Sequence, residues 1–190
     1  MKIGILGGSF NPVHNGHISL AKQLLELAGL DEVWFMVSPQ NPLKRRSDIM
    51  DDDIRLRLVS IALCEEPRLR VCDREMTMPK PSYTMLTMRT LSREYPEHRF
   101  TLLIGGDNWL CFSQWRDYED LLAEYDIAVY PRTGSEIDVN TLPPRVKLYD
   151  VSRIDISSTQ IRQFIKQGRS IDGLVPPSVA AVISKEGLYL

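Results

Sequence analysis

Short apolar runs alternate along the chain with longer segments whose apolar residues recur every three or four positions. A compact apolar run is typical of a strand buried on both faces of a parallel sheet, and the longer spacing is typical of an amphipathic helix. Gly29 and Pro96 each follow a helical segment and mark its end. The pattern predicts strands at 3–6, 33–37, 69–72, 100–104, 126–130 and 146–149. It predicts helices at 18–28, 53–65, 82–95, 118–124, 157–167 and 177–185.

Strands that alternate with helices predict an α/β fold with a mainly parallel, doubly wound, Rossmann-like sheet flanked by helices. Such sheets bind ligands beyond the carboxyl ends of their strands. The turns at Gly7, Pro39, Gly105 and Pro131 all follow predicted strands, so we expect them to meet at one edge. Segments 39–53 and 133–144 are expected to be loops. No linker divides the chain, which predicts one domain over 1–190, with a helical portion from about 155 to 190.

The amino-acid composition indicates the compartment in which the protein works, but it does not indicate which chemistry the protein carries out. The chain has 190 residues and a formal net charge of −2, which gives no support for nucleic acid or an anionic membrane as a partner. It has no apolar stretch near the roughly 20 residues that span a bilayer, and no signal-peptide pattern. Three scattered cysteines without a CxxC pair favour a reducing compartment. We therefore expect a soluble, cytoplasmic protein; a homo-oligomer is left open.

The segment from Gly7 to His17 reads GGSFNPVHNGH, between the first predicted strand and the first predicted helix. A helix start offers unpaired N–H groups and the positive end of its dipole, and glycines let a phosphate approach the backbone. The spacing fits neither G-x-G-x-x-G nor the P-loop, in which a lysine follows the last glycine. The sequence therefore predicts a phosphate site of another class.

His14 and His17 admit three interpretations. They could donate to phosphate oxygens, cap or pack the helix, or hold a metal. Helix capping would be the usual role of an isolated histidine, but the glycine turn favours phosphate. Zinc is disfavoured because no Cys, Asp or Glu ligand lies nearby in the sequence, so no protein metal site is predicted.

A second group of donors precedes the helix predicted at 157–167. Ser157 or Ser158 can cap this helix, and Ser157 with Gln160 fits a capping box. Ser158 and Thr159 also place N–H and hydroxyl donors at the helix start, while the guanidinium of Arg162 can bind a phosphate with two hydrogen bonds. Capping and phosphate binding are compatible here.

Three segments together resemble a known family. Gly7 to His17 resembles the H-x-G-H motif of the nucleotidyltransferase superfamily, in the form found in nicotinate-nucleotide adenylyltransferases. The sequence ISSTQIR at 156–162 is similar to that family's I-S-S-T-x-I-R motif. Gly105-Gly106-Asp107, followed by Phe112 and Trp115, is similar to its G-x-D…F…W segment. The matches lie in order and span almost the whole chain.

The resemblance implies transfer of the adenylyl group of ATP to nicotinate mononucleotide, which gives nicotinate adenine dinucleotide and pyrophosphate in NAD biosynthesis. The attack would be direct and in line, without a covalent enzyme intermediate, and Mg²⁺ would sit on the ATP phosphates. The preference for nicotinate over nicotinamide rests on the resemblance. Loss of His14, His17 or Arg162 would have indicated a non-catalytic nucleotide sensor, but all three are present. Pantetheine-phosphate, FMN and glycerol-phosphate nucleotidyltransferases share the first motif, but the Asp107 to Trp115 segment argues against them. An NAD-dependent oxidoreductase is disfavoured because the dinucleotide fingerprint does not fit.

The resemblance also assigns roles to residues. Lys44 lies in an NPLK sequence where the family has N-P-P-H before its lysine, and the neighbouring Arg45 and Arg46 suit a solvated surface equally well. Residues expected to act in catalysis are His14, His17, Lys44 and Arg162. Those expected to bind ATP are Gly7, Gly8, Ser9, Phe10, His14, Gly16, His17, Ser157, Ser158, Thr159 and Arg162. Those expected to bind nicotinate mononucleotide are Ser9, Phe10, Lys44, Tyr83, Thr84, Asp107 and Trp115.

Overall fold

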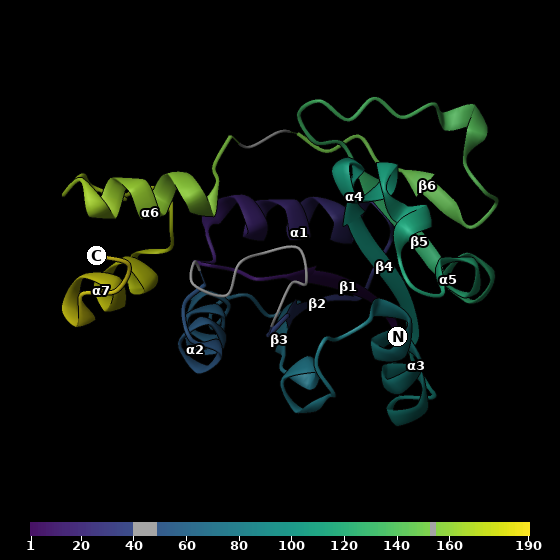
Figure 1. Cartoon of the computed structure of the whole chain (residues 1–190), viewed down its shortest axis with the longest axis horizontal. Helices are drawn as coiled ribbons and strands as arrows, with labels where there is room; N and C mark the ends of the chain where they lie inside the picture. Colours follow the sequence, from purple (N-terminus) through teal and green to yellow (C-terminus); the bar gives the residue numbers. More distant parts are fainter. Residues whose placement is uncertain (40–48, 153–154) are drawn as a thin grey trace.

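The computed structural model describes residues 1–39, 49–152 and 155–190, and its strands form one parallel sheet of order β3-β2-β1-β4-β5-β6 (Figure 1). The strands are β1 (Lys2–Gly8), β2 (Glu32–Val37), β3 (Leu69–Cys72), β4 (Arg99–Gly105), β5 (Asp126–Tyr130) and β6 (Val146–Leu148). The α-helices are α1 (Asn15–Leu27), α2 (Asp52–Ala62), α3 (Thr84–Glu94), α4 (Gly106–Leu110), α5 (Tyr118–Glu124), α6 (Ser158–Lys166) and α7 (Pro177–Glu186). The 3₁₀ helices are η2 (Arg74–Thr77), η3 (Phe112–Gln114) and η4 (Val139–Thr141).

The predicted α/β fold is confirmed, and each of the predicted strands and longer helices is present within a few residues of its predicted ends. Among the described residues, the additional elements are α4 and the 3₁₀ helices η2, η3 and η4. They span three to five residues, which is too short for a helical repeat of apolar positions to be visible in the sequence. The loop expected at 133–144 is irregular apart from η4, where the Asp138 carboxylate accepts a hydrogen bond from the N–H of Asn140 at 2.9 Å.

Side chains that alternate along the strands divide the core into two layers. Ile3 and Ile5 of β1 face one layer, which packs against α3 and α5, whereas Leu6 faces the other, which packs against α1, α2, α6 and α7. Helices therefore cover both faces of the sheet, which explains why every residue of β2 is buried. Among the described helices, none is long and apolar enough to cross a membrane.

The site is positioned by a reversal in the order of the strands. After β1 the chain adds β2 and β3 on one side, then returns to place β4, β5 and β6 on the other. The carboxyl ends of β1 and β4 therefore lie side by side, with the helices that follow them leaving in different directions. A crevice at such a switch point is where open α/β sheets bind their ligands.

Candidate active site

Two stacked imidazoles stand at the start of α1. The ring centroids of His14 and His17 lie 3.6 Å apart, with 23° between the ring planes. His14 is the N-cap residue, and its backbone N–H donates to Nδ1 of His17 at 3.3 Å. This bond uses the Nδ1 lone pair, so a neutral His17 carries its proton on Nε2 and donates from that atom. Helix capping, the alternative to phosphate binding, is thus compatible with a donor role.

His14 is neutral at physiological pH. Its side chain is buried, and this burial, aided by the positive charge of Arg132, lowers its pKa from 6.5 to about 4. Its Nδ1 faces the first turn of α1 without a regular hydrogen bond. The positive end of α1 favours a lone pair at this Nδ1, which assigns the ring proton to Nε2. His14 therefore offers an uncharged N–H donor, and His17 offers a donor at Nε2.

The glycine pattern of the turn has a steric cause. A Cβ at Gly16 would lie 3.0 Å from Nδ1 of His14, and one at Gly8 would lie 3.0 Å from the ring of Phe10. A side chain at either position would push a ring out of place. A Cβ at Gly7 would meet nothing within 4 Å, so this glycine leaves open space at the end of β1.

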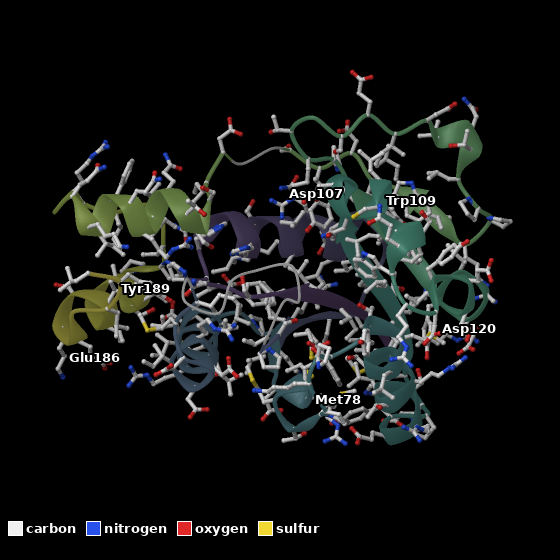
Figure 2. All side chains as sticks on the ribbon, viewed as in Figure 1. Met78, Asp107, Trp109, Asp120, Glu186 and Tyr189 are labelled. Atoms are coloured by element: carbon white, nitrogen blue, oxygen red, sulfur yellow. The ribbon has the colours of Figure 1, made fainter. Side chains whose placement is uncertain are left out.

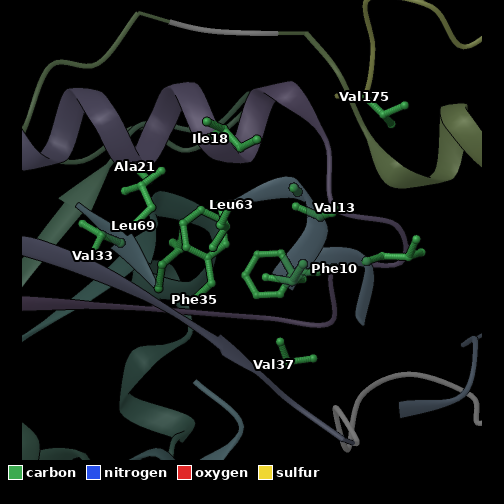
Figure 3. Close-up of a cluster of buried hydrophobic side chains, with 14 of the residues drawn as sticks. Phe10, Val13, Ile18, Ala21, Val33, Phe35, Val37, Leu63, Leu69 and Val175 are labelled. Carbon is green, nitrogen blue, oxygen red and sulfur yellow. The ribbon is translucent and has the colours of Figure 1, made fainter. Parts of the chain in front are cut away.

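The side chain of Phe10 packs between the hydrophobic core and the histidine pair. Its side chain is buried in the core cluster beside Phe35, with the ring centroids 5.2 Å apart (Figure 3). The edge of its ring also contacts His17, at 5.0 Å between centroids. Its backbone has φ of +43°, a left-handed conformation that is strained for a bulky residue. The predicted contact between Phe10 and substrate would therefore have to come from its backbone.

The start of α6 is tied to the glycine turn. The hydroxyl of Ser157 accepts a hydrogen bond from the N–H of Gln160 at 3.2 Å, so Ser157, not Ser158, is the cap. Ser158 donates instead to the carbonyl of Pro12 at 2.8 Å. Two segments that are nearly 150 residues apart in the sequence thus meet at one place.

Arg162 also contacts this turn. Its guanidinium donates to the carbonyl of Asn11 at 2.8 Å and to the hydroxyl of Thr159 at 3.3 Å. Both contacts leave further guanidinium N–H groups for other acceptors, because arginine has five. In this structure the side chain of Arg162 therefore connects the two predicted phosphate motifs.

A cavity of about 350 Å³ opens beside the histidine pair. Four predicted residues line it: His14, Gly16, His17 and Ser157. Arg132, which sequence reasoning did not select, also lines it. This arginine directly follows Pro131, in one of the turns expected at this edge of the sheet. Its place in that turn is the sequence signal that could have identified Arg132 as a site residue.

Arg132 connects the histidine pair with the next part of the site. Its Nε lies 4.0 Å from a carboxylate oxygen of Asp107, and its charge acts on His14. Asp107 lies in the first turn of α4 and is exposed, while the residue that caps α4 is Gly105. Figure 2 shows Asp107 and Trp109 together at α4. Asp107 is therefore available to a ligand and is not the helix cap.

The residues expected around the acceptor ring come from two segments. Tyr83 is the N-cap residue of α3 and Thr84 its first residue. Trp115 follows η3 and packs against Phe112, with 5.2 Å between ring centroids. Arg116, the next residue, places its guanidinium 4.6 Å from the centroid of the Tyr83 ring. The contact brings the start of α3 next to the Trp115 segment, and Arg116 is a second cation that the sequence analysis did not select.

Lys44, with Arg45 and Arg46, lies outside the described residues. Within the described parts of the chain, no group of three or more His, Cys, Asp or Glu side chains is arranged to hold a metal ion. The polar side chains that line the cavity carry imidazole, guanidinium and hydroxyl groups, together with the carboxylate of Asp155 and the amide of Gln160. The imidazole, guanidinium and hydroxyl groups are donors suited to phosphate oxygens, whereas a single carboxylate is not a cage for Mg²⁺, which prefers oxygen ligands.

Comparisons with known proteins agree with this geometry. The cytidylyltransferase-like family matches residues 5–164. A protein from Bacteroides fragilis described as a probable nicotinate-nucleotide adenylyltransferase is 48% identical over 178 residues, which cover 94% of this chain and 89% of the relative. A relative of the same description from Flavobacterium johnsoniae is 40% identical over 191 residues, covering 100% of this chain and 99% of the relative.

A solved structure shares the fold at low sequence identity. It is nicotinic acid mononucleotide adenylyltransferase from Plasmodium falciparum, complexed with NaAD, with a TM-score of 0.81 and 20% identity. The match covers 99% of this chain and 97% of the other. The chain therefore belongs to the cytidylyltransferase-like family of nucleotidyltransferases. Within that family its place is with the nicotinate-nucleotide adenylyltransferases, as the three motifs indicated.

Proposed function

We propose that this protein transfers the adenylyl group of ATP to nicotinate mononucleotide, forming nicotinate adenine dinucleotide and pyrophosphate. The observation that carries the proposal is the cavity into which the stacked histidines of α1, the start of α6 and Arg132 all face. These groups donate hydrogen bonds and positive potential. A site of this kind suits direct attack, in which the protein orients two anions and stabilises charge on the moving oxygens.

In this mechanism an oxygen of the acceptor's 5′-phosphate attacks the α-phosphorus of ATP. The bond between that phosphorus and the oxygen that bridges to the β-phosphate breaks. Pyrophosphate leaves with the electron pair of this bond. His17 donates from Nε2 to the phosphate oxygens, and His14 supports it from the stacked position at 3.6 Å. Because His14 is buried and neutral, it donates without the cost of burying a charge. The N-terminus of α1 adds its dipole to the same oxygens.

Arg162 and the start of α6 complete the phosphate side. Ser158 and Arg162 hold the turn at Pro12 and Asn11, which fixes the two motifs relative to each other. The remaining guanidinium N–H groups and the N–H groups of Ser158 and Thr159 supply donors to ATP. Residues 155–190 thus act as the second half of the phosphate site in a one-domain protein.

The acceptor lies, in this proposal, between α4 and the start of α3. Asp107 accepts hydrogen bonds from a ribose hydroxyl, and Trp115 offers a flat face to the pyridine ring. Tyr83 and Thr84 approach the same ring from α3, and Lys44 contributes a cation to the phosphate. Arg116, above Tyr83, adds positive charge at the place where nicotinate differs from nicotinamide by its carboxylate.

Any Mg²⁺ that the reaction uses would be expected to be bound to the phosphates of ATP. The cavity offers donors to phosphate, so the ion would be held by phosphate oxygens and water without a cage of protein ligands. Its chemical contribution is to offset the negative charge on the phosphates. The free thiols of Cys64, Cys72 and Cys111 suit the cytoplasmic setting expected from the sequence.

One experiment tests the proposal. The purified protein is incubated with ATP and Mg²⁺, and each acceptor is offered separately: nicotinate mononucleotide, nicotinamide mononucleotide, FMN, phosphopantetheine and glycerol phosphate. Pyrophosphate and the dinucleotide product are measured together. We expect pyrophosphate release to be fastest with nicotinate mononucleotide. Absence of pyrophosphate with every acceptor would refute the reaction, and faster turnover with nicotinamide mononucleotide would refute the specificity.

A further inference from the structure

Arg55 in α2 is a fully buried cation outside the residues assigned so far. Its relative exposure is 0%, which is rare for arginine. Its carboxylate partner among the described residues, Asp52, lies 2.6 Å from Nη2 and is itself partly exposed. A buried ion pair is weak evidence for stability, because the cost of removing the charges from water offsets much of their attraction. The position of this guanidinium therefore calls for another explanation.

The guanidinium binds three backbone carbonyls at the carboxyl edge of the sheet. Nη1 donates to the carbonyl of Ser9, in the turn after β1, and to that of Ser38, directly after β2, at 3.0 Å. Nε donates to the carbonyl of Met50, before α2, at 2.9 Å. Arg55 thus joins three chain segments that approach the site from different elements. Lysine, with a single nitrogen, cannot reproduce this planar arrangement of donors.

The turn that Arg55 holds is anchored from both sides. Arg55 binds the carbonyl of Ser9, while Arg162 of α6 binds that of Asn11 at 2.8 Å. The side-chain oxygen of Asn11 also accepts from the N–H of Met50 at 3.1 Å. Between these anchors lies Phe10, with φ of +43°. Such a backbone is strained and persists only where the surrounding contacts hold it in place.

We infer that Arg55 is a positioning residue for the adenylyl transfer, acting through the Ser9–Asn11 turn; this inference rests on the proposed function. Phe10 transmits the effect, because its buried ring contacts His17 at 5.0 Å. When the anchor at Ser9 is lost, the strained turn relaxes, and Phe10 no longer fixes the imidazole of His17. Arg55 itself touches neither substrate.

The test compares Arg55→Lys and Arg55→Met with Arg57→Lys. Arg57 lies in the same helix, is about half exposed and pairs with Glu186 away from the turn, so it is a matched control. Thermal unfolding is measured first, and kcat and both KM values are then measured at a temperature where each protein is folded. We expect Arg55→Lys to lower kcat by about tenfold to a hundredfold, as small misplacements in an active site do. The KM for ATP should change less than about threefold, and Arg57→Lys should match the wild type.

A structural role would give a different result. If Arg55 serves only stability, Arg55→Lys will unfold at a lower temperature but keep the kcat of the wild type while folded, which would overturn the inference. An Arg55→Lys variant that is unfolded at every temperature tested would overturn it as well. Arg55→Met, which lacks the charge and every donor, should lose at least as much kcat as Arg55→Lys. An inactive wild type would refute the proposed function itself, whereas an active wild type beside an unimpaired Arg55→Lys would refute this inference alone.

Discussion

The buried neutral state of His14 predicts how stability depends on pH. In the unfolded chain this imidazole takes up a proton near pH 6.5, but in the folded protein its pKa is lowered to about 4. Between these values the unfolded state binds more protons, so the folded state loses stability as the pH falls. The shift from 6.5 to about 4 corresponds to about 3 kcal/mol in total, of which about 2 kcal/mol is lost by pH 5.

Urea unfolding of the wild type and of His14→Asn isolates this contribution. Asparagine does not titrate and is a favourable N-cap residue, so the variant retains a capped α1. The difference in unfolding free energy between the two proteins is measured from about pH 7.5 down to about pH 4.5. We expect the stability of the wild type, relative to the variant, to fall by about 2 kcal/mol between about pH 7.5 and pH 5. A difference that is constant across this range would refute the assignment of His14 as a buried neutral imidazole.

Three further predictions concern residues around the site. Ser157→Ala removes the cap of α6 and should lower the unfolding free energy by about 1 kcal/mol, measured with urea; no change would show that the bond to Gln160 contributes nothing. Tyr189→Phe removes a buried hydroxyl that has no hydrogen-bond partner among the described residues, so the melting temperature should stay or rise, and a fall would contradict this. Burial already raises the pKa of Tyr189, so its hydroxyl stays neutral. Arg132→Met removes a positive charge and should raise the pKa of His14, followed by NMR titration; an unchanged or lower pKa would be the contrary result.

The fold could be predicted because it depends on short local patterns. The buried strands were visible as compact apolar runs, as in β2, where all residues are buried. The histidine pair was visible because a strand, a glycine turn and a helix are contiguous in the sequence. Figure 2 places Tyr189 beside α7, at the other side of the view from Asp107. The burial of its hydroxyl, which has no partner in the described parts of the chain, could not be predicted, because this burial leaves no local pattern in the sequence.

The arginines show what the sequence could not reveal. Arg55 reads as one polar position of an amphipathic helix, and its burial depends on carbonyls that come from three other segments. Arg132 becomes a site residue only when the end of β5 approaches α4, and Arg116 only when the start of α3 approaches the Trp115 segment. The sequence made Ser157 and Ser158 equal candidates for the cap of α6. In the structure, the hydroxyl of Ser158 donates to the carbonyl of Pro12 instead. These roles depend on contacts between segments that are far apart in the sequence, so the local spacing of residues does not predict them.

The central claim is that the histidine pair stabilises charge on the phosphate oxygens in the transition state. The most direct test is the kcat of His17→Ala, with its unfolding free energy measured alongside. His98→Ala is the matched control, because the third histidine of the chain precedes β4, at the opposite edge of the sheet, and packs against Trp34. We predict that His17→Ala lowers kcat by about 10²–10³, or about 3–4 kcal/mol, as for other lost transition-state donors. The unfolding free energy should fall by far less, and His98→Ala should retain the kcat of the wild type. A His17→Ala protein that keeps its kcat, or that loses stability and activity to the same extent, would contradict the account.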